Sequence, residues 1–371
     1  MNRERQHGSR VDDTSAQSEK QPTQQELSDY RRRRIGRIAS RVVIGGYFAS
    51  LPFQILQTDI ALNKMNLEDS TPAVHSILEA SLPENNDQAT VFIDGFASQD
   101  GSWTTSKIAD TLQIINDSNI WALEYASGGI SIPAIAEQIA KKAEEENVTS
   151  VALYGYSIGG MMALETANEL ISKYNINVST IFLDHSPAGQ DSIRQSIRNQ
   201  ASPAIDAIRW FHSIGIDIEY SSIARDVVNL LFAEDISHLG NTPINLMRDQ
   251  YLYGTETNTD QSIHQLGKTT PTPNIVYITS SDPGSDYMVD VEQSEILYEE
   301  MSDEYQIPFF VIPVDGAIHS RLDLTVEQYA EAFTDAAPLF DERESDFDTY
   351  DYIAQVPLGS RYDTSKEQDD E

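Results

Sequence analysis

The pentapeptide Gly155-Tyr156-Ser157-Ile158-Gly159 sets one serine between two glycines near the middle of the chain. An apolar run with β-branched residues leads into the motif, and a helix-forming run follows it at once. This order predicts a sharp turn from a strand into a helix, in which the glycines let neighbouring backbone approach closely and the hydroxyl is exposed. The amino end of the helix would favour negative charge beside the serine. The motif therefore predicts Ser157 as a nucleophile.

A serine hydroxyl is a weak nucleophile at neutral pH, so it requires a base. His319 lies a few residues after the apolar run PFFVIPV, on a glycine-containing loop ahead of the last helical segment. His185 directly follows another apolar run. Imidazole accepts a proton near neutral pH, and we predict His319 as the general base, with His185 as the alternative.

The imidazole in turn needs a carboxylate that fixes its tautomer and stabilises its charged form. Two aspartates, Asp282 and Asp286, follow the apolar run NIVYIT in the segment before that histidine. Asp286 is followed by Tyr-Met-Val and then by an acidic helix start, whereas Asp282 lies closer to the end of the strand. We favour Asp286 as the acid, and the spacing leaves Asp282 as the alternative.

Hydrolysis at such a serine also needs two N–H donors aimed at the developing alkoxide. One is expected from the backbone of Ile158, directly after the nucleophile. The other is expected from Phe96 or Ala97, in the loop after the apolar run TVFID, where Gly95 frees the backbone. We also expect Gly95 and Tyr156, which adjoin these donors, to contact the substrate.

Strand-like and helix-like segments alternate from residue 89 onward, which is typical of a parallel sheet covered by helices on both faces. The predicted strands are 90–94, 120–125, 150–154, 180–183, 274–279 and 308–314. The predicted helices between and after them are 106–116, 132–147, 159–174, 291–305 and 325–336. Because strands and helices alternate, right-handed crossovers would wind them into a single α/β sheet.

One interval interrupts this alternation. Residues 188–272 contain helix-like stretches at 192–200, 204–214 and 224–232 but no clear strand. An insertion between two such strands commonly forms a cap over the ligand cleft at the carboxyl ends of the strands. We therefore expect a helical cap, in which the aromatic side chains of Trp210, Phe211 and Tyr220 would suit an apolar substrate.

The serine motif, followed in order by the aspartate pair and His319, together with the Asp-Gly-Phe-Ala-Ser loop at 94–98, resembles the α/β-hydrolase fold family over residues 89–336. That family usually has His-Gly where this chain has Asp94-Gly95. The resemblance implies acyl transfer to water through an acyl-enzyme, without a metal or an organic cofactor. Lipases, carboxylesterases and thioesterases share this machinery, so the implied substrate is a small or lipid-like acyl ester.

The ends of the chain differ in composition from its centre. Residues 1–34 are polar and basic and are expected to be disordered. Residues 35–58 combine an apolar run with preceding arginines, which predicts a membrane anchor or a secretory signal, with an amphipathic helix on the domain as the alternative. Residues 59–88 are expected to be a linker or lead-in to the domain, and residues 337–371 an acidic tail. We therefore expect the protein to be membrane-anchored or extracytoplasmic, with a cytoplasmic location as the alternative.

Composition excludes some functions. The formal net charge is −34, and ten of the 25 basic residues lie at or before Arg41, so the rest of the chain is strongly acidic. Such a surface repels nucleic acid, and no nucleic-acid partner is expected. The absence of cysteine excludes disulfides and thiolate nucleophiles. A serine hydrolase is the predicted function, and a catalytically silent binding or scaffold protein tethered to the membrane is the alternative.

Overall fold

The computed structural model describes residues 53–338 apart from 69, 97, 222–241, 318, 320, 321, 323 and 324. The chain divides into two units, Met1–Pro52 and Phe53–Glu371, and all described residues belong to the second. The predicted segment 1–34, all but the last six residues of 35–58, all but the first two of 337–371, and the predicted helix 224–232 therefore lie outside the described residues.

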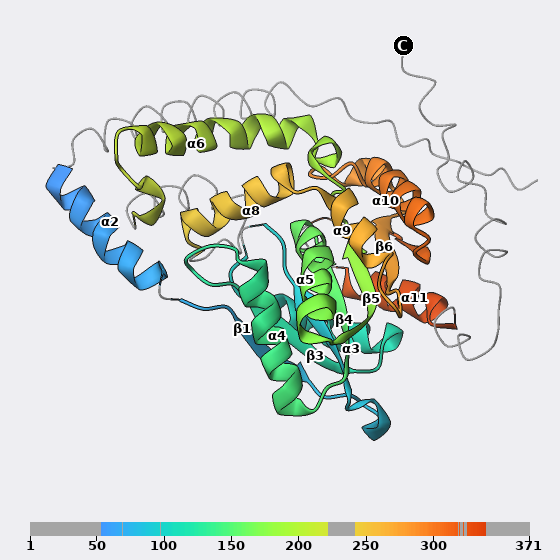
Figure 1. Cartoon of the computed structure of the whole chain (residues 1–371). Coiled ribbons are helices and arrows are strands. Elements are labelled where there is room, and N and C mark those ends of the chain that lie inside the picture. The colour runs from blue at the N-terminus through green and yellow to red at the C-terminus, as the bar shows by residue number, and fades with distance from the viewer. Residues whose placement is uncertain are drawn as a thin grey trace, which may run out of the picture. The chain divides into compact units, whose positions relative to one another are not determined.

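A seven-stranded sheet with the order β1-β3-β2-β4-β5-β6-β7 forms the centre of the second unit (Figure 1). Edge strand β1 runs antiparallel to β3, and all other neighbours pair in parallel. The strands are β1 (Ala73–Leu78), β2 (Gln88–Ile93), β3 (Asn119–Glu124), β4 (Ser150–Tyr156), β5 (Asn177–Asp184), β6 (Asn274–Ser280) and β7 (Phe309–Val314). The predicted α/β class with a mostly parallel sheet is confirmed.

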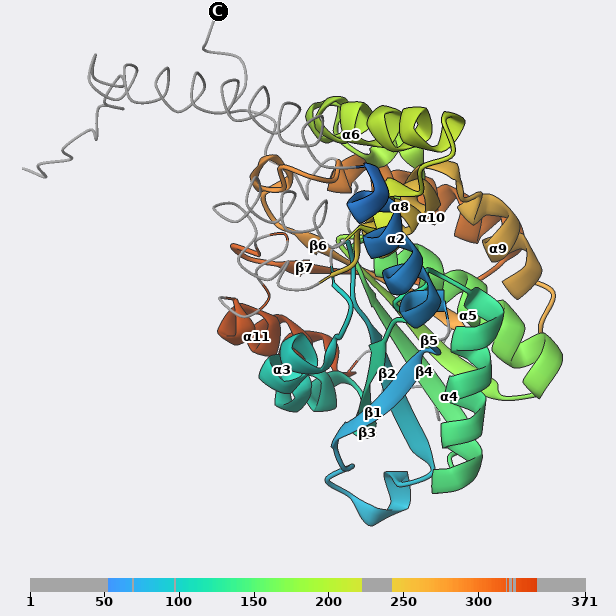
Figure 2. The ribbon, with the colours of Figure 1, turned by 90° about the vertical axis from the view of Figure 1, so that its left-hand side faces the viewer.

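Helices cover both faces of this sheet, and α4 and α5 lie on the opposite side from α3 and α11 (Figure 2). The helices that adjoin the strands are α3 (Ser102–Ile115), α4 (Ile132–Glu146), α5 (Ile158–Tyr174), α10 (Val291–Tyr305) and α11 (Val326–Ala336). Between β5 and β6 lie α6 (Gln195–Ser213), α8 (Ile244–Glu256) and α9 (Thr259–Leu266). Helix α2 (Phe53–Glu68) precedes β1. Short 3-10 turns are η1 (Pro83–Asn85), η2 (Gln190–Ser192), η3 (Ile218–Tyr220) and η4 (Pro283–Ser285).

The central strands are apolar throughout because both of their faces are covered. Strand β6 is buried along its whole length, and β4 is buried after its first residue. Alternate side chains enter two apolar clusters: Leu153 and Tyr277 lie in the cluster under α4, α5 and α10, whereas Tyr154 and Val276 lie in the cluster under α3 and α11. Burial of apolar surface on both faces fixes the register of these strands and the position of the loops at their ends.

Two predicted boundaries are wrong. The sheet begins within the 59–88 segment predicted as a linker, because β1 belongs to the sheet. Its polar centre, His75 and Ser76, is exposed at the edge of the sheet, which explains why the strand lacks an apolar signal. Helix α6 is also continuous across Pro203, where two helices were expected. A proline inside a helix can bend it without ending it.

The segment 35–58 falls partly outside the described residues, and its last six residues begin α2. Helix α2 is joined to η3, since Lys64 Nζ lies 2.7 Å from Asp217 Oδ2 and Ser221 Oγ donates to Asp59 Oδ2 at 2.8 Å. Among the helices that the structure describes, none is both long and apolar enough to cross a membrane.

Candidate active site

The carboxyl ends of five parallel strands meet at one edge of the sheet, and each is followed by a residue of the predicted site. These residues are Gly95 after β2, Ser157 after β4, His185 after β5, Asp286 after β6 and His319 after β7. Loops at this edge are the usual ligand site of open α/β sheets. The sheet therefore brings together residues that are up to about 220 positions apart in the sequence.

Ser157 occupies a strained turn between β4 and α5. Its backbone has φ 54° and ψ −129°, in the region of positive φ that residues other than glycine rarely adopt. The backbone approaches closely at this turn, and a Cβ on Gly159 would overlap the carbonyl oxygen of Ile93. The Ser157 N–H donates to Asp184 O at 2.8 Å, which ties the turn to the end of β5. The strand-to-helix turn expected around this serine is therefore present.

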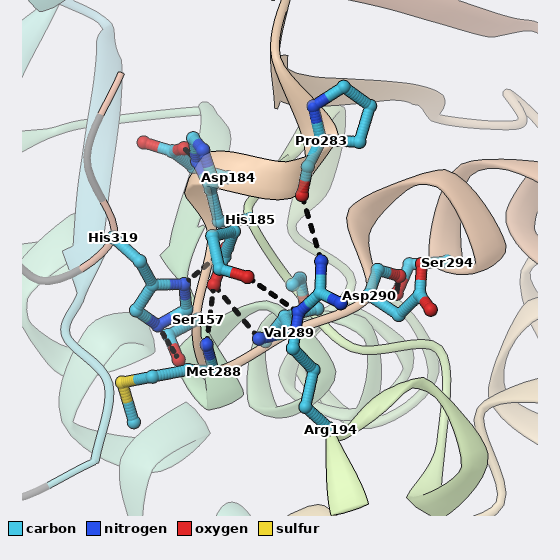
Figure 3. Close-up of polar contacts among 12 residues, drawn as sticks. Ser157, Asp184, His185, Arg194, Pro283, Met288, Val289, Asp290, Ser294 and His319 are labelled. Atoms are coloured by element: carbon cyan, nitrogen blue, oxygen red, sulfur yellow. Dashed lines mark hydrogen bonds and ion pairs between the residues drawn. The ribbon is translucent and has the colours of Figure 1, made fainter. Parts of the chain in front are cut away.

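His319 links the serine to a carboxylate (Figure 3). Its Nε2 lies 3.0 Å from Ser157 Oγ, and its Nδ1 lies 2.7 Å from Asp286 Oδ2. Because a carboxylate can only accept, Nδ1 carries the proton, which leaves Nε2 free to accept from the hydroxyl. The imidazole is 1% exposed, so bulk water does not compete for these bonds. This is the arrangement that a general base for Ser157 requires.

Asp286 is held by its own loop, which we call the acid loop and define as residues 282–290. Its buried carboxylate uses Oδ1 to accept the N–H groups of Met288 and Val289, at 2.8 and 2.9 Å. Burial alone would raise the pKa of Asp286, but the charge and hydrogen bond of His319 outweigh it, and the net pKa is lowered. Asp286 therefore remains ionised beside His319.

Asp282, the alternative acid, lies at the start of the same loop, where it caps a turn. Its Oδ1 accepts the N–H of Gly284 at 3.1 Å, which caps the turn η4. The described hydrogen bonds of His319 go to Asp286 and Ser157, and none goes to Asp282. The geometry therefore favours Asp286 as the orienting acid.

The loop after β2, residues 94–98, which we call the oxyanion loop, lies against the nucleophile. A Cβ on Gly95 would lie 2.8 Å from Ser157 Cβ and 3.4 Å from its Oγ, so only glycine fits there. Ile158, which follows the serine, is the first residue of α5. Phe96 is half-buried in the loop, and Ala97 lies outside the described residues. The two predicted backbone donors thus come from the elements that adjoin Ser157.

Two further polar side chains anchor the oxyanion loop. Gln250 on α8 is fully buried and donates through Nε2 to Gly95 O at 3.2 Å and to Ser98 O at 2.8 Å. Tyr125 OH donates to Asp94 O at 2.5 Å. Gln250 could not be identified from the sequence, because 155 residues separate it from the glycine it contacts.

The predicted aromatic neighbours differ in their placement. Tyr156 is buried, and its ring lies 5.6 Å from the ring of His319, between centroids. Trp210 is 58% exposed on α6, and its ring packs edge-on against Phe211 at 4.9 Å. No described contact brings Trp210 or Phe211 to the catalytic side chains, so their part in substrate binding stays a prediction.

His185, the alternative base, belongs to a second buried pair. Its Nδ1 lies 2.6 Å from Asp184 Oδ1, and its ring centroid is 5.8 Å from that of His319. Asp184 also accepts the hydroxyls of Tyr154 and Tyr329, at 2.5 and 2.9 Å. Burial lowers the pKa of His185, but the hydrogen bond and charge of Asp184 outweigh it, and the net pKa is raised. In the described contacts it is His319, not His185, that reaches Ser157.

The architecture and the site together define a class. A mostly parallel sheet with one antiparallel edge strand, a serine on the strained turn after β4, and then an aspartate and a histidine after β6 and β7 are the features of the α/β-hydrolase fold. The chain has this fold, as its resemblance implied. Between β5 and β6 it carries a helical insertion. Within the described residues, no group of three or more acidic or histidine side chains could hold a metal ion.

Similarity to known proteins is found among solved structures. No family model matches the sequence, and no curated protein matches it. The chain is similar to a lipase-esterase related protein from Clostridium acetobutylicum ATCC 824, with 13% identity, a TM-score of 0.44 and coverage of 72% of this chain and 99% of that one. It is also similar to MenH from S. aureus, with 14% identity, a TM-score of 0.45 and coverage of 74% and 99%. A third similar structure is olei00960, a hydrolase from Oleispira antarctica, with 10% identity, a TM-score of 0.45 and coverage of 76% and 98%.

Proposed function

We propose that the chain is a serine hydrolase that cleaves a carboxylic ester or thioester through an acyl-enzyme. The observation that carries this proposal is the hydrogen-bonded path from Ser157 through His319 to Asp286, with distances of 3.0 and 2.7 Å. Ser157, His319 and Asp286 are 5%, 1% and 0% exposed, so bulk water hardly reaches the hydrogen bonds between them. Backbone strain at a serine that is hydrogen-bonded through a histidine to an ionised aspartate is typical of a catalytic site, and a silent scaffold would not require it.

In the first half of the reaction, Ser157 Oγ attacks the carbonyl carbon of the substrate and its proton passes to His319 Nε2. The negative charge that develops on the carbonyl oxygen is stabilised by the N–H groups of Ile158 and Phe96. Asp286 stabilises the imidazolium that forms. The bond to the alcohol or thiol then breaks, and His319 gives its proton to the leaving group.

In the second half, a water molecule attacks the ester that now joins the acyl group to Ser157. His319 takes the proton from this water and returns it to the serine oxygen as the carboxylic acid leaves. The reaction uses no metal and no organic cofactor in this proposal. The acyl group is apolar and small or lipid-like, as an insertion over the site would accommodate.

Labelling with a fluorophosphonate probe tests the proposal. We expect labelling of the wild type and its loss in Ser157→Ala, because the probe reacts with an activated serine. We expect His319→Ala to lower kcat by about a thousandfold or more. A folded wild type that remains unlabelled would favour the scaffold. Retained activity in His319→Ala with loss in His185→Ala would move the base to His185.

A second experiment ranks the members of the hydrolase class. A series of p-nitrophenyl esters of increasing chain length, with matching thioesters, would give kcat/KM for each acyl group. We expect a preference for ester or thioester over amide substrates. Efficient amide cleavage, or transfer of the acyl group to an added alcohol in preference to water, would instead favour a peptidase or an acyltransferase.

We further propose that residues 35–58 associate the protein with a membrane, on the basis of the arginine run followed by a charge-free run from Val42 to Thr58. The acidic remainder of the chain would then face away from the anionic lipid surface. Fractionation of cells that contain the full-length chain tests this. Recovery in the membrane or extracytoplasmic fraction is expected, and recovery wholly in the soluble cytosol would contradict it.

A further inference from the structure

The acid loop is docked on the first residues of the cap. Residues 192–194 lie antiparallel to residues 288–290, and an isolated bridge joins the middle residues of the two segments. Asp290 N–H donates to Ser192 O at 2.7 Å, and Arg194 N–H donates to Met288 O at 3.0 Å. This pairing fixes the part of the loop that follows Asp286.

The side chain of Arg194 fixes the part of the loop that precedes and includes Asp286 (Figure 3). Its Nε donates to the carbonyl oxygen of Asp286 at 2.6 Å, and its Nη2 donates to the carbonyl oxygen of Pro283 at 2.8 Å. These two carbonyls belong to one turn, and a planar guanidinium holds both in a fixed relation. Hydrogen bonds from a charged donor are stronger than neutral ones.

The position of the carboxylate depends on this turn. Asp286 Oδ1 accepts from two N–H groups of its own loop, so the carboxylate moves with the loop backbone. Oδ2 must at the same time stay 2.7 Å from Nδ1 of His319. A displacement of about 1 Å at a catalytic group can lower a rate about a hundredfold. A residue that fixes the acid loop therefore also keeps His319 in the tautomer with its proton on Nδ1.

We propose that Arg194 is a positioning residue that holds Asp286 in place for His319, and that it couples the cap to the catalytic side chains. The proposal rests on the proposed function, since it concerns the same three side chains. Arg194 does not contact the reacting atoms and acts only through the acid loop. Among the described residues, the side chain of Arg194 forms no ion pair with a carboxylate, and its described hydrogen bonds go to the two loop carbonyls.

Arg198, in the first turn of α6 and four residues after Arg194, offers a matched control. Its side chain is 23% exposed and its Nη1 lies 3.6 Å from Asp191, whose side chain is 87% exposed. Arg198→Gln therefore removes the same charge four residues further along the chain, on α6, and none of its described contacts goes to the acid loop. Arg194→Gln removes both loop bonds, and Arg194→Lys keeps the charge but can replace only part of the two-pronged contact.

The first test measures kcat and KM for an ester substrate in these three variants, after thermal melts have verified that each is folded. For Arg194→Gln we expect kcat to fall about 10- to 100-fold with KM changed less than about threefold, because the serine and the substrate pocket are intact. Arg194→Lys should recover part of the loss, and Arg198→Gln should match the wild type. Equal kcat values in Arg194→Gln and Arg198→Gln would overturn the proposal, as would a loss confined to KM.

The second test does not depend on turnover. The proton on His319 Nδ1 should give a low-field proton NMR signal, which is identified by its absence in His319→Gln. We expect Arg194→Gln to shift or abolish this signal and Arg198→Gln to leave it unchanged. An unchanged signal in Arg194→Gln would overturn the positioning role even if the wild type shows no hydrolysis, whereas a missing turnover alone would contradict only the proposed function.

Discussion

Replacement of Asp286 by asparagine should leave the shape of the site intact and reverse the polarity of its hydrogen bond to His319. In the wild type, Oδ1 accepts two N–H groups from Met288 and Val289, and Oδ2 accepts from His319 Nδ1. The amide oxygen of the asparagine must take the place of Oδ1, because an NH₂ group there would face two donors. The NH₂ group then faces the imidazole and can only donate to it.

This reversal forces the wrong tautomer on His319. With Nδ1 accepting, the ring proton moves to Nε2, which lies 3.0 Å from Ser157 Oγ and can no longer take its proton. Loss of tautomer control in a serine triad lowers kcat by about 10⁴-fold, which corresponds to about 5.5 kcal/mol of transition-state stabilisation at about 1.4 kcal/mol per tenfold. Substrate binding is untouched, so KM should change little.

The assay is kcat for a p-nitrophenyl ester, with the rate of fluorophosphonate labelling as a second readout. Asp282→Asn is the matched control, because this aspartate lies in the same loop and caps η4 through Gly284. We expect Asp282→Asn to stay within a few-fold of the wild type. A kcat for Asp286→Asn within tenfold of the wild type would refute the reasoning, and an equal loss in both variants would place the acid elsewhere.

Three other predictions follow from the same contacts. Gly95→Ala should lower kcat about 10- to 100-fold, because the new Cβ would lie 2.8 Å from Ser157 Cβ and displace the oxyanion loop; unchanged kinetics would contradict this. Gln250→Met keeps the length of the side chain but removes the described donor of Ser98 O and leaves Gly95 O with the weak 3.4 Å bond from Ser98 N–H, so urea unfolding should show a loss of about 1–3 kcal/mol, and an unchanged midpoint would contradict it. Because the pKa of Asp286 is lowered in the folded protein, its ionised form stabilises the fold above the ordinary pKa of 3.8, and this contribution is lost as the pH falls further. The free energy of unfolding of the wild type should therefore fall more steeply with acid than that of Asp286→Asn, and parallel curves would contradict it.

Most of the central sheet could be predicted from the sequence because its strands are buried on both faces. The runs that form β4 and β6 are continuously apolar, and each is followed by a helical segment of ordinary length. Strand β1 was missed for the opposite reason, since it is an edge strand whose exposed centre contains His75 and Ser76. Helix α6 was divided at Pro203 because local propensity alone does not show that a proline is accommodated within a helix.

Part of the candidate site could be predicted because some catalytic residues occur in recognisable sequence contexts. Ser157 is set between glycines that a tight turn requires, and His319 follows a clear strand. The choice between Asp282 and Asp286 depends on interatomic distances, which the spacing along the sequence does not give. In the structure, the imidazole of His319 is hydrogen-bonded to Asp286, whereas Asp282 caps η4.

The supporting residues could not be predicted at all. Arg194 and Gln250 act on backbone carbonyls that are 92 and 155 residues away in the sequence. A carbonyl is present at every position, so a donor to it leaves no motif. Only the folded chain shows that these two side chains of the insertion hold the acid loop and the oxyanion loop.

Trapping of the acyl-enzyme tests the central claim most directly. The protein would be mixed with a p-nitrophenyl ester, quenched in acid during turnover and digested, and the peptide that contains Ser157 would be weighed by mass spectrometry. We predict a mass increase equal to the acyl group on Ser157, and none in Ser157→Ala. Hydrolysis of the ester without any acyl group on that serine, or with the acyl group on another residue, would contradict the account.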